Sequence, residues 1–238
     1  MSQGERTDRE PTNRILAALK PKDQKRLLAD TTSVSLEFKR RLLEPGKAID
    51  AVYFPESAVV SLLTTMDDGG AVEVATVGNE GIVGVPVFLG GQAMSARDLY
   101  QVQVPGQARA MDTASFLEAT ERDPLRGLVQ RYAQALFTQV SQQVACNARH
   151  SVTERCGRWM LLTADRVGQS EFPLTQEFLA QMLGVRRASV TVAAGTLQNA
   201  GFIHYSRGRM TIIDREGLEN ASCECYRIIR TEFDRLLP

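Results

Sequence analysis

The strongest constraint on the fold lies in residues 174–213, where two short helical patterns meet at a glycine. Thr175 can cap free N–H groups with its hydroxyl, and Glu177 falls in the first turn, where the helix dipole favours an anion. Gly184 stands where a left-handed residue can end a helix. The apolar positions of the first helix are Phe178, Leu179, Met182 and Leu183, and those of the second are Val190, Ala194 and Leu197. This spacing predicts two packed helices joined by a tight turn.

A basic hairpin follows the second helix. Asn199-Ala200-Gly201 ends that helix, and Phe202–Tyr205 and Met210–Ile213 alternate as two short strands around Arg207-Gly208. Between Gly184 and Ile213 there are four arginines and no carboxylate, although the whole chain has 28 basic and 28 acidic residues. Phosphate contact requires such locally clustered cations. The pattern predicts a winged helix-turn-helix that binds double-stranded DNA.

In a helix-turn-helix the N-terminal part of the second helix enters the major groove. The candidate DNA-binding residues are therefore Arg186, Arg187, Ser189 and Thr191 on that helix, with Arg207 and Arg209 on the wing.

The N-terminal part of the chain has a different sequence pattern. Asn13–Leu19 and Asp23–Leu28 suggest short helices separated by Pro21. Short β-rich runs with turn signals between them then follow: Ser33–Phe38, Ala51–Phe54, Val59–Thr64, Val72–Val77, Gly81–Phe88 and Leu99–Val104. Many short strands at this spacing favour a β-sandwich or barrel over an α/β sheet.

A long helix connects the two parts. Pro124 suits its first turn, and an apolar stripe recurs at intervals of three or four residues. The stripe either packs entirely on the chain's own β-domain or forms a seam with a second copy of the chain. We favour the homodimer, because helix-turn-helix proteins commonly bind paired half-sites. The candidate interface is Leu125, Val129, Tyr132, Leu136, Val140 and Val144.

The fold class is thus α+β, with four expected segments. They are a disordered tail at 1–12, a β-roll (jelly roll) sensor at 13–122, a long dimerisation helix at 123–150 and a winged helix-turn-helix at 151–238. Ser151 and Glu154 have the spacing of a capping box that opens the next helix, so residue 150 is the expected hinge.

Composition excludes several other classes. No apolar run is long enough to cross a bilayer, and the polar N-terminus lacks the apolar core of a signal peptide, so a cytoplasmic protein without a membrane partner is expected. The cysteines, Cys146, Cys156, Cys223 and Cys225, form no paired C-x-x-C sets. Two residues apart on a helix, Cys223 and Cys225 would point about 200° from each other, so we interpret the cysteines as structural and expect no metal. His150 and His204 have no triad partners, and no catalytic residues are predicted, which argues against an enzyme.

This order of parts resembles the Crp/Fnr family of bacterial transcription regulators, named for the cyclic-AMP receptor protein and the fumarate-nitrate reduction regulator. The resemblance runs from about Asn13 to Ile213 and is most specific in Leu174–Val190 and in Val77–Gly84. It implies that Thr175 and Gln176 contact the DNA backbone and that Arg187 reads guanine. Ala188 replaces a family glutamate and Val192 a family arginine, which implies a different operator, with Ser189 and Thr191 as substitute readers.

The resemblance also bears on the effector. The family's ribose-binding Gly-Glu pair matches Gly84 and Val85, and its phosphate-binding Arg-Ser pair falls near Arg97. Val85 cannot accept a ribose hydrogen bond, so the pocket is expected to be degenerate for cyclic AMP and the effector is unknown. Iron–sulfur or haem sensing is not expected, because no cysteine precedes Cys146 and the β-domain holds no histidine.

Two alternatives stay open. One is a cyclic-nucleotide-responsive regulator of the same fold. The other is a ligand-binding module whose winged domain contacts protein. Four arginines without carboxylate neighbours would argue against this alternative. An activator would also contact RNA polymerase.

Overall fold

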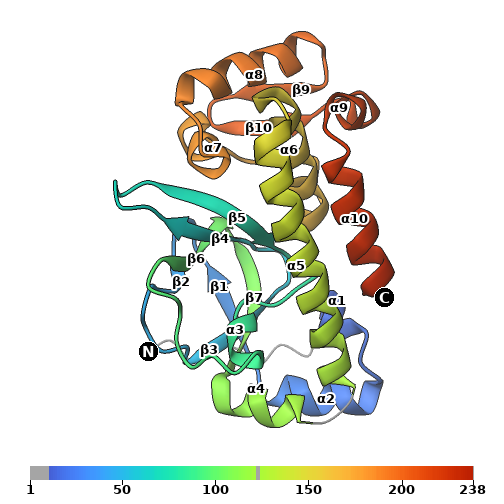
Figure 1. The fold of residues 1–238 in the computed structure, drawn as a ribbon. Helices are drawn as coiled ribbons and strands as arrows, with labels where there is room; N and C mark the ends of the chain where they lie inside the picture. The colour runs from blue at the N-terminus through green and yellow to red at the C-terminus, as the bar shows by residue number, and fades with distance from the viewer. Residues whose placement is uncertain (1–10, 122–123, 238) are drawn as a thin grey trace.

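The computed structural model describes residues 11–121 and 124–237 (Figure 1). Two antiparallel sheets form the N-terminal roll. One has the order β1-β7-β3, made of Thr32–Leu36, Gly106–Asp112 and Ala51–Pro55. The other has the order β2-β6-β4-β5, made of Arg41–Leu43, Asp98–Val104, Val59–Thr65 and Ala71–Val77. The predicted β-roll is therefore present, its strand pairs are antiparallel, and apolar side chains of both sheets share a common core.

One predicted strand is wrong. Gly81–Phe88 makes only an isolated bridge, between Val83 and Tyr53, before Gly84 adopts a φ of +118°. The chain then forms the short helix α3, Val85–Phe88, with a proline in its first turn. The sequence does not predict strands β2, β7 and β8 (Glu171–Pro173). In β7 (Gly-Gln-Ala-Arg-Ala-Met-Asp) the β-branched residues that signal a strand are missing.

The N-terminal helices are α1, Arg14–Ala17, and α2, Pro21–Ala29. Pro21 opens α2 at a position where its missing N–H costs nothing, rather than standing between the helices. Asn13 caps α1 and donates from Nδ2 to the carbonyls of Pro55 and Gly81, at 2.9 and 2.8 Å. Of the tail predicted at 1–12, residues 1–10 lie outside the described residues, whereas Pro11 is buried and Thr12 Oγ1 donates to the carbonyl of Glu56.

Helix α4, Thr113–Thr120, closes the roll, and α5, Leu125–Arg149, runs from there to the C-terminal part. A capping box between Ser151 and Glu154 opens α6, Val152–Val167, as predicted. The remaining elements are β8 (Glu171–Pro173), α7 (Gln176–Leu183), α8 (Arg187–Asn199), β9 (Ile203–Ser206), β10 (Arg209–Ile212), α9 (Arg215–Ala221) and α10 (Cys225–Leu236). Figure 1 shows α10 returning along α5, so that the C-terminus lies near α1.

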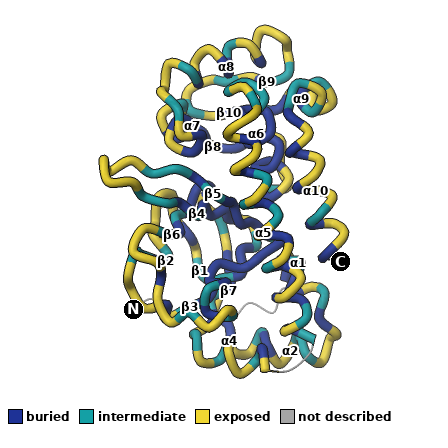
Figure 2. The backbone as a smooth tube through the Cα atoms, in the orientation of Figure 1, coloured by how far each residue is buried: buried dark blue, intermediate teal, exposed yellow. Residues whose placement is uncertain are grey.

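The apolar stripe of α5 faces mainly into its own chain. Leu125, Val129, Tyr132 and Leu136 are buried, and the Tyr132 ring lies 6.2 Å from that of Phe233 on α10. The prediction that these four residues form the dimer interface is therefore wrong. They are core positions, because the roll and α10 pack on this face of α5. Val140 is half-buried and Val144 is exposed. Figure 2 shows buried residues gathered where the roll, α5 and α6 meet.

The roll also packs directly on the C-terminal part. The rings of Phe38 and Phe178 meet edge to face at 5.4 Å, and Gly184 lies against Val72 of β5. Gln103 Nε2 donates to Thr163 Oγ1 on α6 at 3.0 Å. In the described residues no helix is both long and apolar enough to cross a membrane.

Candidate DNA-binding surface

Helices α7 and α8 meet at the turn that the sequence predicts. The hydroxyl of Thr175 accepts a hydrogen bond from the N–H of Phe178 at 3.1 Å, which caps α7. Gly184 ends the helix with a φ of +62°, a conformation that costs a glycine little. The carbonyl of Leu183 accepts a bond from the Arg155 guanidinium, which ties α7 to α6. The buried residues of α8 are Val190, Ala193, Ala194 and Leu197. The apolar faces predicted for both helices are confirmed.

The opposite face of α8 is open to solvent. Arg186, Arg187 and Thr191 are exposed, and Ser189 is half-buried. Thr191 Oγ1 donates to Gln176 Oε1 at 2.8 Å, so the start of α7 and the first turns of α8 form one polar surface. Two side chains expected to contact DNA thus orient each other.

The wing is a two-residue hairpin. Ser206 of β9 pairs with Arg209 of β10, and the turn residues Arg207 and Gly208 have φ values of +50° and +77°. Positive φ at both positions is typical of a type I′ turn, whose twist matches that of the flanking strands. Arg207 is therefore exposed at the tip. β8 pairs along the other edge of β10 and completes a three-stranded sheet.

One of the predicted cations has a carboxylate partner. Arg209 Nε lies 2.5 Å from Glu171 Oε1, so the expectation that all four arginines lack acidic neighbours is wrong for Arg209. Glu171 precedes the stretch over which the charges were counted, and the pairing of β8 with β10 brings it back. Within residues 11–121 and 124–237, Arg186, Arg187 and Arg207 form no ion pair. Three unpaired cations therefore mark the surface.

Each residue proposed for an effector pocket in the roll is buried or already engaged by a neighbouring side chain. Gly84 packs on Val52, and Val85 is buried in α3. Arg97 is half-exposed, and its Nη2 lies 2.6 Å from Asp67 Oδ1 on the β4–β5 turn. The only cation of that set is thus held by an aspartate, which a phosphate would have to displace.

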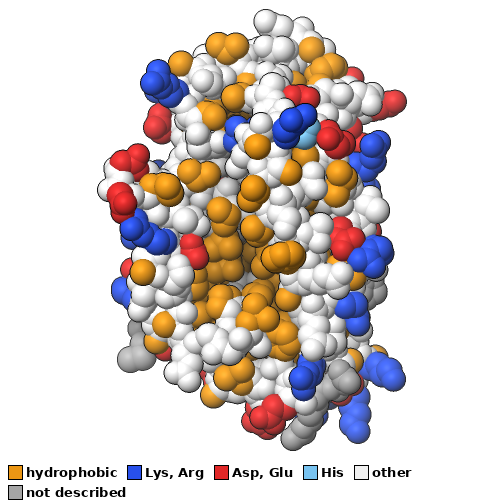
Figure 3. All heavy atoms as spheres, in the orientation of Figure 1, with side chains coloured by type: hydrophobic (Ala, Val, Ile, Leu, Met, Phe, Trp, Pro, Cys, Tyr) orange, Lys and Arg blue, Asp and Glu red, His pale blue; other side chains and the backbone are white. Residues whose placement is uncertain are grey.

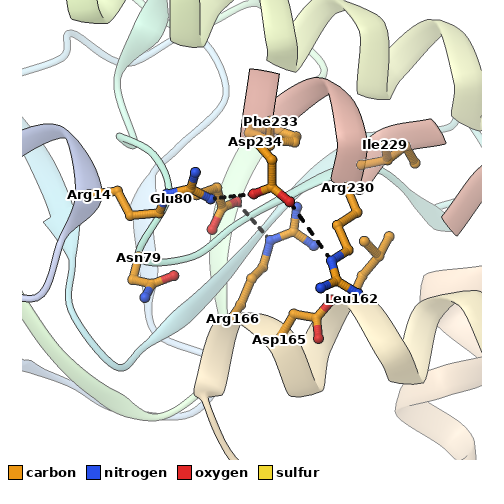
Figure 4. Close-up of a pocket in the computed structure, with 10 residues that line it drawn as sticks. All are labelled: Arg14, Asn79, Glu80, Leu162, Asp165, Arg166, Ile229, Arg230, Phe233 and Asp234. Carbon is orange, nitrogen blue, oxygen red and sulfur yellow. Dashed lines mark hydrogen bonds and ion pairs between the residues drawn. The ribbon is translucent and has the colours of Figure 1, made fainter. Parts of the chain in front are cut away.

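A cavity of about 260 Å³ lies elsewhere, where α1, α6, α10 and the turn at Asn79 meet (Figure 4). Arg166 Nε donates to Glu80 Oε1 at 2.7 Å with both side chains buried, and Arg14 Nη1 lies 3.1 Å from Asp234 Oδ1. Arginines and carboxylates neutralise each other across this cavity. Its walls hold the roll, α6 and α10 together rather than offering a free cation to an anionic ligand.

The structure also brings together residues from two distant parts of the chain. Cys146, His150, Cys223 and Cys225 converge, with one potential ligand atom of each within 4.8 Å of all the others. The expectation of purely structural cysteines rested on a helical position for both Cys223 and Cys225. Cys223 instead precedes α10, which begins at Cys225, so the 200° argument does not apply.

Comparison with known proteins agrees with this architecture. The family described as Crp-like helix-turn-helix domain matches residues 154–221. No curated protein sequence matches the chain.

Solved structures match over most of the chain. A transcriptional regulator assigned to the Crp/Fnr family from Eubacterium rectale is 15% identical, with a TM-score of 0.65 over 85% of this chain and 94% of that one. A CRP-family regulator from Thermus thermophilus is 18% identical, with a TM-score of 0.65 over 79% and 96%. The c-di-GMP-responsive global regulator CLP from Xanthomonas campestris is 16% identical, with a TM-score of 0.64 over 81% and 99%. Residues 154–221 thus form a Crp-like helix-turn-helix domain, and the chain has the fold of these Crp/Fnr-type regulators.

Proposed function

We propose that the protein acts in the cytoplasm as a homodimeric, sequence-specific regulator that binds a palindromic operator in double-stranded DNA. The observation that carries the proposal is the group of exposed, unpaired arginines at the start of α8 and at the wing tip. A helix-turn-helix places that end of its second helix in the major groove, and a wing tip reaches phosphates beside it.

The positions suggest separate roles. Arg187, in the first turn of α8, can make a bidentate contact with guanine O6 and N7. Ser189 and Thr191 lie beside it as further readers, and Ala188 offers no carboxylate for cytosine. Arg186 and Arg207 suit phosphate contacts, as do the hydroxyl of Thr175 and the amide of Gln176. Arg209 would have to leave Glu171 to contact DNA.

An exposed strip of α5 supports the homodimer. Phe137 is 74% exposed and Val144 67% exposed, and the half-buried Ala133 and Val140 complete a spacing of four, three and four residues. This is the a/d spacing of a two-helix seam. Figure 3 shows hydrophobic side chains gathered in the middle of one face, with charged side chains mainly around its edge. The seam therefore uses Val140 and Val144 of the predicted set, together with Phe137.

The roll is proposed as a sensor whose effector differs from cyclic AMP. Two observations support an effector other than cyclic AMP: Val85 is buried and non-polar, and Arg97 is already paired with Asp67. The alternative, a cyclic-nucleotide-responsive regulator, is tested by calorimetric titration with cyclic AMP. Cyclic di-GMP belongs in the same panel because one structural neighbour responds to it. Contact with RNA polymerase is expected if the protein is an activator.

DNA binding is tested by fluorescence anisotropy with a random-sequence duplex at several salt concentrations. The affinity of the wild type should fall steeply with salt, and Arg186→Ala and Arg207→Ala should each reduce the log–log slope by about one. Arg26→Ala, an exposed arginine on α2, is the matched control and should leave the slope unchanged. Equal slopes for all four proteins would contradict the proposed surface.

A further inference from the structure

Four side chains converge at the junction of α5, α6 and α10. Cys146 and His150 lie four residues apart at the C-terminal end of α5 and therefore share one face. Cys223 and Cys225 flank Glu224 at the start of α10. The Cys146 and Cys223 sulfurs are 3.5 Å apart, and Cys225 Sγ is 3.5 Å from His150 Nδ1. The three cysteines are buried.

The spacing of these atoms fits one ion. Ligand atoms around a tetrahedral ion with metal–sulfur bonds of about 2.3 Å lie about 3.8 Å apart. In this group every ligand atom lies within 4.8 Å of the others, and two of the separations are 3.5 Å. Small shifts of the side chains would bring all four onto one tetrahedron. A four-iron cluster needs wider spacing, because each cysteine binds a different iron.

The carboxylate of Glu224 lies next to the second ring nitrogen of His150. His150 Nε2 lies 3.1 Å from Glu224 Oε2, on the side of the ring away from the cysteine sulfurs. A metal-bound histidine usually donates its second ring N–H to such a carboxylate, which fixes the tautomer and the orientation of the ring. A simple pair of adjacent thiols would need neither the histidine nor Glu224.

A buried cation adjoins the sulfurs. Arg158 of α6 is 2% exposed, and in the described part of the chain its Nε and Nη2 have no hydrogen-bond partner. Arg158 lies near enough to Cys146, Cys223 and Glu73 for its positive charge to favour their ionised forms. Three thiolates with a divalent ion carry a net charge of −1, which would help to balance this guanidinium.

We propose that Cys146, His150, Cys223 and Cys225 bind one thiophilic divalent metal ion of the zinc class. Four protein ligands fill a tetrahedral shell and leave no open position, so the site is structural rather than catalytic. His150 is the C-cap of α5 and Ser151 the N-cap of α6. The ion therefore ties the hinge between the long helix and the DNA-binding part to α10, whose other end reaches the roll.

The first test is metal content. Protein purified with a phosphine reductant and no chelator should hold about one zinc per chain by inductively coupled plasma mass spectrometry. After chelator stripping, one equivalent of cobalt(II) should give the visible d–d bands and the sulfur-to-cobalt charge-transfer band of a tetrahedral thiolate site. Both measurements are independent of DNA binding and stand whether or not the regulatory proposal holds.

Variants separate the cluster from the other cysteine. Cys223→Ala and Cys225→Ala should lose most of the bound metal and the cobalt spectrum, and Glu224→Gln should weaken metal affinity about 10–100-fold. The matched control is Cys156→Ala, because Cys156 is equally buried on α6 but outside the cluster; it should keep full metal content. Circular dichroism checks that each variant folds.

A measurement on the wild type alone decides the matter if cluster variants fail to fold. An organomercurial titrated into the zinc-loaded protein should release one zinc ion as three thiols react. A chromogenic chelator measures the released zinc. The proposal is overturned if the wild type binds neither zinc nor cobalt, or if Cys156→Ala loses as much metal as Cys223→Ala. A Cys146–Cys223 disulfide in the intact mass of protein kept under reductant would also overturn it.

Discussion

Trp159 on α6 donates its indole N–H to the carboxyl of Glu73 on β5 at 3.0 Å, inside the contact between the roll and the DNA-binding part. Ser61 Oγ donates to the other carboxyl oxygen at 2.6 Å. A titratable group thus lies fully buried between the roll and α6, where a change in its charge would affect the contact between them.

The pH dependence of stability should report this group. Burial raises the pKa of Glu73 from 4.5 to about 7, against the opposing effects of the Ser61 hydrogen bond and Arg158. Between these two values the folded chain keeps a proton that the unfolded chain has lost. The free energy of unfolding should therefore fall as pH rises through this window, by about 3 kcal/mol in total, and stay level above it. Urea unfolding from pH 4.5 to 8 measures the change.

Glu73→Gln provides the variant for this prediction. The neutral amide cannot ionise, so the variant should be more stable than the wild type at pH 8 and should lack that part of the pH dependence. Glu118→Gln, on the exposed side of α4, controls for the loss of one negative charge. An unchanged pH profile in Glu73→Gln would show that another group is responsible.

Arg187→Ala should relax specificity at one position of each half-site. If Arg187 reads guanine, the variant should lose about 1–3 kcal/mol on the preferred sequence and almost nothing on a duplex that carries another base there. Competition binding with single-base variants of the operator measures this difference. A uniform loss across all sequences would assign Arg187 to phosphate contact.

The α5 seam predicts a change of oligomeric state. Phe137→Glu with Val144→Glu places two charges on each side of the proposed interface, and sedimentation equilibrium should show monomers where the wild type forms dimers. Leu89→Glu is the control, because Leu89 is 69% exposed and lies directly after α3, outside the proposed α5 seam. If the double variant stays dimeric, the seam lies elsewhere.

Two glycines should respond oppositely to alanine. A Cβ at Gly81 would overlap the ring of Tyr132, so Gly81→Ala should lower the free energy of unfolding by about 1–3 kcal/mol. A Cβ at Gly195, within α8, meets nothing within 4 Å. Gly195→Ala should therefore raise stability by about 0.5–1 kcal/mol. Thermal or chemical unfolding distinguishes the two, and a stable Gly81→Ala would argue against tight packing of this turn on α5.

The helix-turn-helix could be predicted from the sequence because its determinants are local. Thr175 caps its own helix, Gly184 supplies a left-handed turn, and Arg207-Gly208 forms a two-residue hairpin loop. The partner of the α5 stripe could not be predicted, because a helical period shows that a face is buried but not which element covers it. Leu125 and Tyr132 contact the chain itself, and Phe137 lies on another face.

The cysteine–histidine cluster had no local signal. Cys146 and Cys223 are separated by 77 residues, and only the return of α10 along α5 brings them together. The Arg209–Glu171 pair has the same origin, since it depends on β8 joining the wing sheet. In both cases the side chains meet through long-range packing that spacing along the chain does not reveal.

The most direct test of the central claim is selection of bound DNA from a random duplex pool with the purified protein, with and without cyclic AMP. We expect enrichment of a two-fold symmetric site, with half-sites about one helical turn (10–10.5 bp) apart and without dependence on the nucleotide. Failure to enrich any sequence, or enrichment of a single unpaired half-site, would contradict a dimeric sequence-specific regulator. Enrichment only with cyclic AMP would contradict the degenerate pocket.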